Sequence, residues 1–64
     1  MITEEIEIFY VEVRSKVTNE IITDVRVGNS YQQAVTEKDA LDMVWNDGST
    51  YTAIVSDWEE EKTQ

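Results

Sequence analysis

The chain lacks the residues on which small proteins most often depend for covalent or metal-based stability. It contains no cysteine, no histidine and no proline, and only 2 glycines among its 64 residues. It can therefore form no disulfide, and it lacks the side chains that hold structural zinc, haem or iron–sulfur clusters. A domain of this length buries only about 60% of the surface of its unfolded chain. We therefore expect association to add stability, most simply as a homodimer.

The same absences remove most catalytic chemistry. Histidine is the most frequent general base, and cysteine is the usual thiol nucleophile. Ser15 and Lys16 are adjacent, but neighbouring strand residues point to opposite faces and cannot act together. A calcium loop with Gly48 as its sixth residue would begin at Met43 and end at Ile54, and neither side chain can ligate a metal ion. We predict a protein that is not an enzyme and that binds no metal or cofactor.

Negative charge dominates the residues that are present. Fourteen acidic residues against 5 basic residues give a net charge of -9. Such a surface repels nucleic acid and anionic lipid, and it attracts basic proteins at rates that fall as salt is added. We therefore expect no direct nucleic-acid or membrane binding and a larger protein with a basic surface as the partner. The alternative is that the charge serves only solubility.

No segment has the pattern of a membrane span or a secretion signal. The longest apolar run is 8–11, far short of the ~20 residues that a spanning helix needs. Residues 1–5 include neither a basic start nor the apolar core of a signal peptide. We expect a cytoplasmic protein.

Residues 36–48 have the start, periodicity and stop signals of a helix. Thr36 can cap the first turn, and Asp39 can complete a capping box by reaching back to the Thr36 amide. Gly48 can adopt the left-handed conformation that ends many helices. The expected apolar stripe consists of Ala40, Leu41, Val44 and Trp45.

Strands are predicted at 5–17, 21–27 and 50–58, which are rich in β-branched and aromatic residues. In the first segment the apolar alternation changes phase near residues 8–10. This change predicts either a bulge or a strand that is apolar on both faces.

The first two strands are expected to form a hairpin through a three-residue loop at 18–20. That loop would pair Val13 with Val25 and Val11 with Val27, so that odd-numbered residues share one apolar face.

Residues 30–35 admit two interpretations. They fit a short additional strand, or the start of a longer helix that Ser30 caps with Gln33 as its box partner. We favour the strand because Thr36 begins such a complete cap. The predicted fold is an α+β domain over residues 1–58, with a small antiparallel sheet of three to four strands and one helix packed on one face. Residues 59–64 are expected to form an acidic, frayed tail.

Partner binding is predicted from two aromatic residues, Trp58 and Tyr10, and from acidic residues of the first strand and the C-terminal tail. Trp58 ends the last strand beside three glutamates, where a monomer has little left to bury it, and tryptophan is favoured at interfaces. Core packing is expected for Trp45 and for Phe9 or Tyr10, while an apolar patch that includes Trp58 and Tyr10 is expected to hold the partner. The predicted partner-binding residues are Tyr10, Trp58, Glu59, Glu60, Glu61, Glu5, Glu7 and Glu12.

In size, acidity and compactness the chain resembles the short accessory and inhibitor proteins that bacteriophages and other mobile elements direct against host enzymes or defence systems. The likeness implies a small, acidic, non-enzymatic inhibitor that occupies a basic or functional surface of a larger host protein. Carboxylates spaced along a strand and a helix could do so by imitating DNA phosphates. The alternative function is a self-assembling structural homo-oligomer with no heterologous target.

Overall fold

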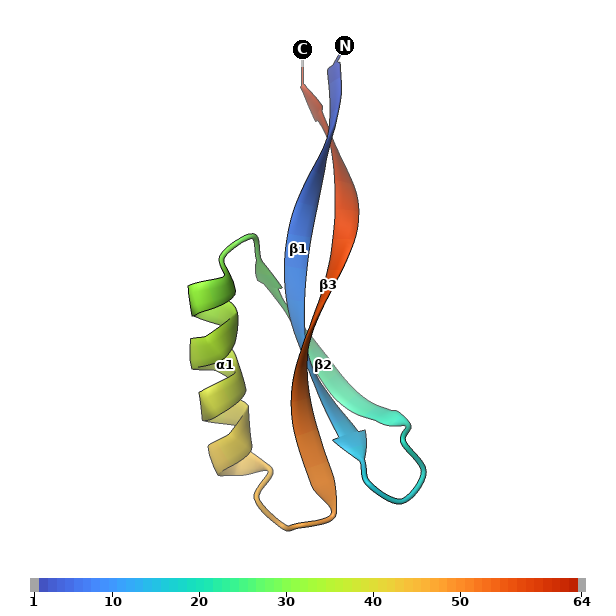
Figure 1. Cartoon of the computed structure of the whole chain (residues 1–64), viewed down its shortest axis with the longest axis vertical. Coiled ribbons are helices and arrows are strands. Elements are labelled where there is room, and N and C mark those ends of the chain that lie inside the picture. Colours follow the sequence, from blue (N-terminus) through green and yellow to red (C-terminus); the bar gives the residue numbers. More distant parts are fainter. Residues whose placement is uncertain (1, 64) are drawn as a thin grey trace.

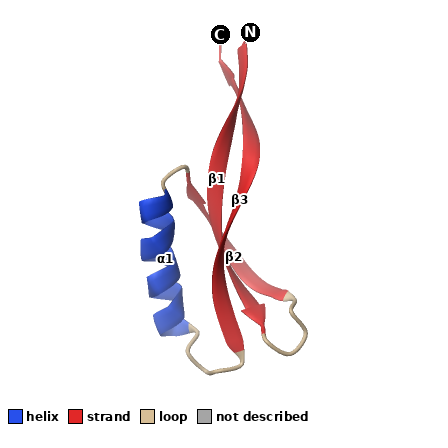
Figure 2. Cartoon of the chain, in the orientation of Figure 1, coloured by secondary structure: helices blue, strands red, loops and turns tan. Residues whose placement is uncertain are grey.

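The computed structural model describes residues 2–63, which form three strands and one helix. In chain order these are β1 (Ile2–Ser15), β2 (Ile21–Gly28), α1 (Tyr31–Val44) and β3 (Thr50–Thr63). The strands make an antiparallel sheet in the order β2-β1-β3, and α1 lies along the sheet (Figures 1 and 2). The predicted α+β fold is confirmed.

β1 is the central strand, but its two neighbours differ in length. β3 pairs with it without interruption from Ile2 to Ser15, whereas β2 pairs only with the stretch from Phe9 to Arg14. The outer halves of β1 and β3 therefore project past β2 and α1 as a two-stranded ribbon (Figure 1). We call residues 2–8 and 57–63 the acidic ribbon.

Burial on both faces of β1 explains the change of phase in its alternation. Val11 and Val13 are fully buried on the side of α1, while Ile8 and Glu12 on the opposite side are only 6% and 7% exposed. The pairing with β2 also shifts between Phe9 and Tyr10. Of the two predicted explanations, the strand buried on both faces is correct, whereas the predicted bulge in this strand is not found on β1.

The extra residue of this irregularity belongs to β2. Phe9 pairs with Gly28 while Tyr10 pairs with Arg26, so Val27 has no counterpart on β1. β1 itself keeps a regular register with β3 along its whole length.

The predicted hairpin register is wrong by two residues. Val11 pairs with Val25 and not with Val27, and Val13 pairs with Thr23. A shift by two preserves the side-chain face of Thr23 and Val25, but a second irregularity, between Val13 and Arg14, places Ile21 opposite Arg14 and so on the other face. The predicted apolar face is therefore correct for Val11, Val13 and Val25 but wrong for Ile21, which is 47% exposed.

The turn explains the shift, because β1 ends at Ser15 and a longer loop follows. The Ser15 carbonyl accepts a hydrogen bond from the Asn19 amide at 2.9 Å, and the Ser15 hydroxyl accepts from the amides of Val17 and Thr18. Asn19 adopts a left-handed conformation with φ 63°, which asparagine tolerates better than most residues. Val17 consequently lies in the loop and is 85% exposed.

The predicted strand at 30–35 is wrong, and the alternative of a longer helix is correct. Ser30 is the N-cap of α1, and its hydroxyl accepts from the Gln33 amide at 3.2 Å. Thr36 lies inside the helix, where its hydroxyl donates to the carbonyl of Gln32. The earlier start adds Ala34 to the core, where it is fully buried, and this burial outweighs the local capping signal at Thr36.

The buried face of α1 differs from the predicted stripe. Ala34 is buried and Leu41 and Trp45 are half-buried, whereas Ala40 is exposed and Val44 is 73% exposed. The less exposed residues Ala34, Lys38, Leu41 and Trp45 have i, i+4, i+7, i+11 spacing, and the face that they form excludes Ala40 and Val44. The helix also ends at Val44, before Gly48.

Polar contacts attach the last turns of α1 to β3. The hydroxyl of Thr52 donates to the Asp42 carboxylate, which also pairs with Lys38 at 3.1 Å. These two partners hold the pKa of Asp42 below its usual value, the Thr52 hydrogen bond contributing most. Asp42 therefore stays charged.

The expected frayed tail from residue 59 onward is also wrong. β3 continues to Thr63, and the register places Glu59 opposite Ile6 and Glu60 opposite Glu5. The reason is that β1 begins at Ile2, three residues before the predicted start, and its backbone pairs with the end of the chain. Within residues 2–63, no helix combines the length and apolar character that a membrane-crossing helix needs.

The position of the helix cap gives a direct mutational test. Ser30→Ala should lower the free energy of unfolding by about 1 kcal/mol, because a helix amide loses its acceptor. Thr36→Ala should leave it unchanged or raise it by less than about 0.7 kcal/mol, because alanine is the better residue inside a helix. Urea denaturation of both variants measures the difference. The reverse order of effects would place the cap at Thr36.

Candidate functional site

The predicted partner-binding residues lie on two faces of the sheet. Residues directly opposite one another in register share a face, and the pairs of β1 with β3 assign each side chain. Glu5, Glu7, Trp58 and Glu60 lie on the face that α1 occupies, whereas Tyr10, Glu12 and Glu59 lie on the open face. The side chain of Glu61 lies outside the described residues. The structure therefore does not unite the predicted residues in a single surface.

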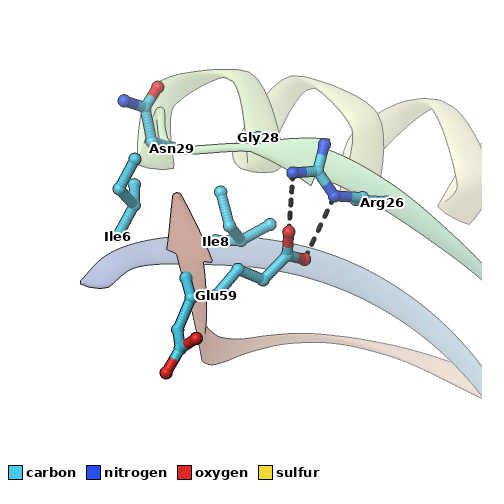
Figure 3. Close-up of a pocket in the computed structure, with 7 residues that line it drawn as sticks. Ile6, Ile8, Arg26, Gly28, Asn29 and Glu59 are labelled. Carbon is cyan, nitrogen blue, oxygen red and sulfur yellow. Dashed lines mark hydrogen bonds and ion pairs between the residues drawn. The ribbon is translucent and has the colours of Figure 1, made fainter. Parts of the chain in front are cut away.

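On the open face, Glu59 connects all three strands. Its carboxylate accepts the hydroxyl hydrogen of Tyr10 on β1 and two hydrogen bonds from Arg26 on β2. The Arg26 bonds are 3.1 Å from Nε and 2.9 Å from Nη2 (Figure 3). This two-point guanidinium–carboxylate geometry fixes direction as well as distance. We call these three residues the Glu59 cluster.

The cluster fixes the ionisation of its members. The Arg26 hydrogen bond, followed by that of Tyr10, lowers the pKa of Glu59 below its usual value. The hydrogen bond to Glu59 raises the pKa of Tyr10, and it also raises that of Arg26. A general acid or base needs a pKa close to the working pH. These shifts all move away from neutrality, so the cluster is poorly suited to proton transfer.

The Glu59 cluster also covers Ile8. Along the open face Ile8 lies between Ile6, which is opposite Glu59, and Tyr10, which is opposite Arg26. The bond from Tyr10 to Glu59 consequently passes over Ile8, which is only 6% exposed although no helix lies on this side. Two of the predicted partner-binding residues, Tyr10 and Glu59, thus contribute to the fold itself.

Glu12 is likewise occupied by an internal contact. Its carboxylate is mostly buried and pairs with Arg14 Nη2 at 3.2 Å. The prediction of partner-binding residues included neither Arg14 nor Arg26. The alternation within each strand could have identified both arginines, because it places Arg14 on the face of Tyr10 and Glu12, and Arg26 on the polar face of β2.

The α1 side of the acidic ribbon is more open. Trp58 is 61% exposed and lies opposite Glu7, while Glu5 and Glu60 are exposed and lie directly opposite each other. Like charges in this cross-strand position repel and destabilise a sheet. The Glu5–Glu60 pair therefore destabilises the fold of the isolated chain.

An aromatic row leads from α1 onto this surface. Tyr31, in the first turn of α1, meets Phe9 edge to face with ring centroids 5.5 Å apart, and it remains 58% exposed. Trp58 lies one cross-strand step further along the same face, diagonal to Phe9. Exposed aromatic surface bordered by glutamates is thus the most distinctive feature of the ribbon.

A pocket of about 360 Å³ lies where β2 ends. Ile6 and Ile8 form its apolar part, and Arg26, Gly28 and Glu59 contribute the polar part (Figure 3). Among the side chains that the structure describes, no group of three or more acidic residues is placed to hold a metal ion.

Comparison with known proteins identifies no relative, because no protein-family model, curated protein or solved structure matches the chain.

Two isosteric substitutions separate the structural glutamate from its neighbour. At pH 7, Glu59→Gln should lower the melting temperature because it removes the charge that Arg26 and Tyr10 contact. Glu60→Gln makes the same change in net charge but relieves repulsion from Glu5, so it should raise the free energy of unfolding by less than about 1 kcal/mol. Thermal denaturation followed by circular dichroism compares the two.

The pH dependence of the Glu59→Gln effect follows from the lowered pKa. A carboxylate with a lowered folded-state pKa stabilises the fold above its unfolded pKa of about 4.3, and that stabilisation disappears as pH falls through the folded-state value. The difference between wild type and Glu59→Gln should therefore be full at pH 7, begin to fall near the unfolded pKa of about 4.3 and disappear once the pH lies below the lowered folded-state pKa. A difference that persisted at pH 2 would show that Glu59 acts through packing and not through charge.

Proposed function

We propose that the protein is a small acidic binding protein without catalytic activity, which inhibits or masks a larger protein by occupying a basic surface with its acidic ribbon. The observation that carries the proposal is the placement of Glu5 directly opposite Glu60 on an exposed face. Cationic side chains on a partner would convert this unfavourable pair into a favourable one. The bound state would thereby recover the folding cost of the ribbon.

Trp58 supplies the apolar half of this interface. It lies on the same face as the two glutamates and is 61% exposed. Tryptophan is among the residues most enriched at interface hot spots, where surrounding polar contacts exclude water. In this proposal the carboxylates accelerate encounter, and burial of Trp58 slows dissociation.

The ionisation of the open face supports the absence of catalysis. Glu59 is held as a carboxylate and Tyr10 as a neutral hydroxyl by contacts within the fold. Neither group is free to exchange a proton with a substrate near neutral pH. The proposal therefore assigns the protein a steric action.

The finer form of the proposal concerns the target. Size and acidity favour an inhibitor of the phage or mobile-element type, acting in the cytoplasm on a host enzyme or anti-phage defence protein. If the ribbon imitates DNA, duplex DNA should compete with it for the target, because both would occupy the same basic groove. Binding that excess duplex DNA leaves unchanged would contradict mimicry without affecting the broader proposal.

A pair of triple variants tests the ribbon as the binding surface. Glu5→Gln, Glu7→Gln and Glu60→Gln together remove three charges from the α1 side of the ribbon and leave Glu59 intact. The control removes three charges elsewhere through the substitutions Glu20→Gln, Glu37→Gln and Asp39→Asn, all at exposed positions. The net-charge change is equal, so the position of the charges is the variable.

Each variant is used to capture proteins from a cell extract at low salt, and association rates with the captured partner are then measured across salt concentrations. The wild type and the control should capture the same protein, whereas the ribbon variant should associate at least about tenfold more slowly and with a flatter salt dependence. Equal losses in both variants would contradict a role for the ribbon.

A homodimer remains the second candidate, favoured by apolar surface at the end of α1. Met43 and Val44 are 79% and 73% exposed, which a second copy could cover. Because each copy carries a charge of -9, screening should strengthen a dimer as salt rises, whereas binding to a basic partner should weaken. Light scattering at several protein and salt concentrations distinguishes these trends, and a mass that stays monomeric throughout would exclude the dimer and the structural homo-oligomer.

A further inference from the structure

The acidic ribbon contains a free strand edge. β2 pairs with β1 only from Phe9 onward, whereas β3 pairs with the whole strand. Within the described chain, the side of residues 2–8 that faces away from β3 has no strand partner. Alternate residues of such an edge present backbone N–H and C=O groups that can pair with an added strand.

The end of β2 leaves this edge accessible. Gly28 ends the strand with φ 135°, and the chain then turns away through Asn29 into α1 (Figure 1). A Cβ atom placed on Gly28 would meet no atom within 4 Å. The pocket of about 360 Å³ opens at this point, with Ile6 and Ile8 projecting from β1 beside Gly28 and Asn29 (Figure 3).

The side chains along the edge specify a complementary pattern. On the α1 side β1 presents Glu5 and Glu7; on the open side the exposed Glu4 precedes Ile6, and Ile8 beyond it is already only 6% exposed. The cation of Arg26 lies on the open side and would repel a basic residue there. Beside residues 5–7, an added strand would therefore carry lysine or arginine on the α1 side and an apolar residue against Ile6 on the open side, in alternation.

We propose that the free edge of β1 at residues 2–8 accepts an extended cationic segment of the partner protein as an additional strand in line with β2. This inference rests on the proposed function and specifies how the acidic ribbon binds: main-chain hydrogen bonds supply affinity, and the alternating side chains supply selectivity. A second copy of this edge fits less well, because antiparallel pairing around Glu5 would place it against its own counterpart and join two chains of charge -9.

The probe is the blocked peptide acetyl-Lys-Val-Lys-Val-Lys-Val-Lys-amide, titrated into the ¹⁵N-labelled wild-type protein. Two matched peptides carry N-methyl groups either on the valines or on the lysines. In an extended strand the valine amides point to one edge and the lysine amides to the other. A peptide of the same composition with its lysines and valines grouped in two blocks controls for charge.

The expected result is saturable binding that shifts and protects amides of residues 2–8 and slows their exchange at least tenfold. N-methylation of one residue type should weaken binding at least tenfold, because it removes the amide donors that pair with the edge. N-methylation of the other type should weaken binding less than threefold. The block peptide should bind at least fivefold more weakly than the alternating one. Ile6→Gln should weaken the alternating peptide at least threefold, whereas Met43→Gln on the distant end of α1 should not.

Other outcomes overturn the inference. Equal effects of the two N-methylated frames, or protection confined to the outer edge of β3, would exclude strand addition at β1. If all four peptides bound equally with strong salt dependence, the proposed function would stand and the edge inference would fail. If none bound even at low salt, the attraction to basic partners would fail as well. Concentration-dependent protection of residues 2–8 without any peptide would show that a second copy occupies the edge.

Discussion

The structure depends on one central strand that must be buried on two faces when the chain has only one helix. β1 pairs on both sides, and its side chains enter the core alternately from each face. α1 covers Val11 and Val13 on one face. On the other, the Glu59 cluster covers Ile8 and links all three strands. Arg26 and Glu59 are 55% and 37% exposed, so the ion pair is expected to position the strands more than to stabilise them.

The same arrangement separates a folding half from an exposed half. Where β2 and α1 are present, charged and aromatic side chains serve the fold. Past the end of β2, the α1 side of the acidic ribbon has no covering layer, yet it keeps Glu5 opposite Glu60 and leaves Trp58 exposed. A small core gives little surplus stability to offset such repulsion. This contrast is the reason for proposing that the ribbon binds a partner, to which the free edge of β1 would offer a backbone for pairing.

Sequence periodicity was sufficient for the fold class, the core strands and the existence of one helix. It could not decide where the helix begins, because Ser30 and Thr36 both form good local caps and only the burial of Ala34 separates them. The turn at Asn19 set the hairpin register through backbone geometry that side-chain patterning does not encode. The absence of apolar residues from 59–64 suggested a frayed tail, but β1 starts earlier than predicted and pairs with residues 59–63, which extends β3.

The candidate site was less accessible to sequence reasoning, because the adjacent residues Glu59 and Glu60 of β3 lie on opposite faces and Glu59 pairs with Arg26 of β2.

The most direct test of the two-sided burial of β1 is hydrogen–deuterium exchange of the free monomeric protein, followed amide by amide. The slowest amides should lie between Phe9 and Arg14, where β1 pairs on both sides, and alternate amides of residues 2–8 should exchange quickly at the free edge. Uniformly fast exchange, or greatest protection in the ribbon, would contradict it.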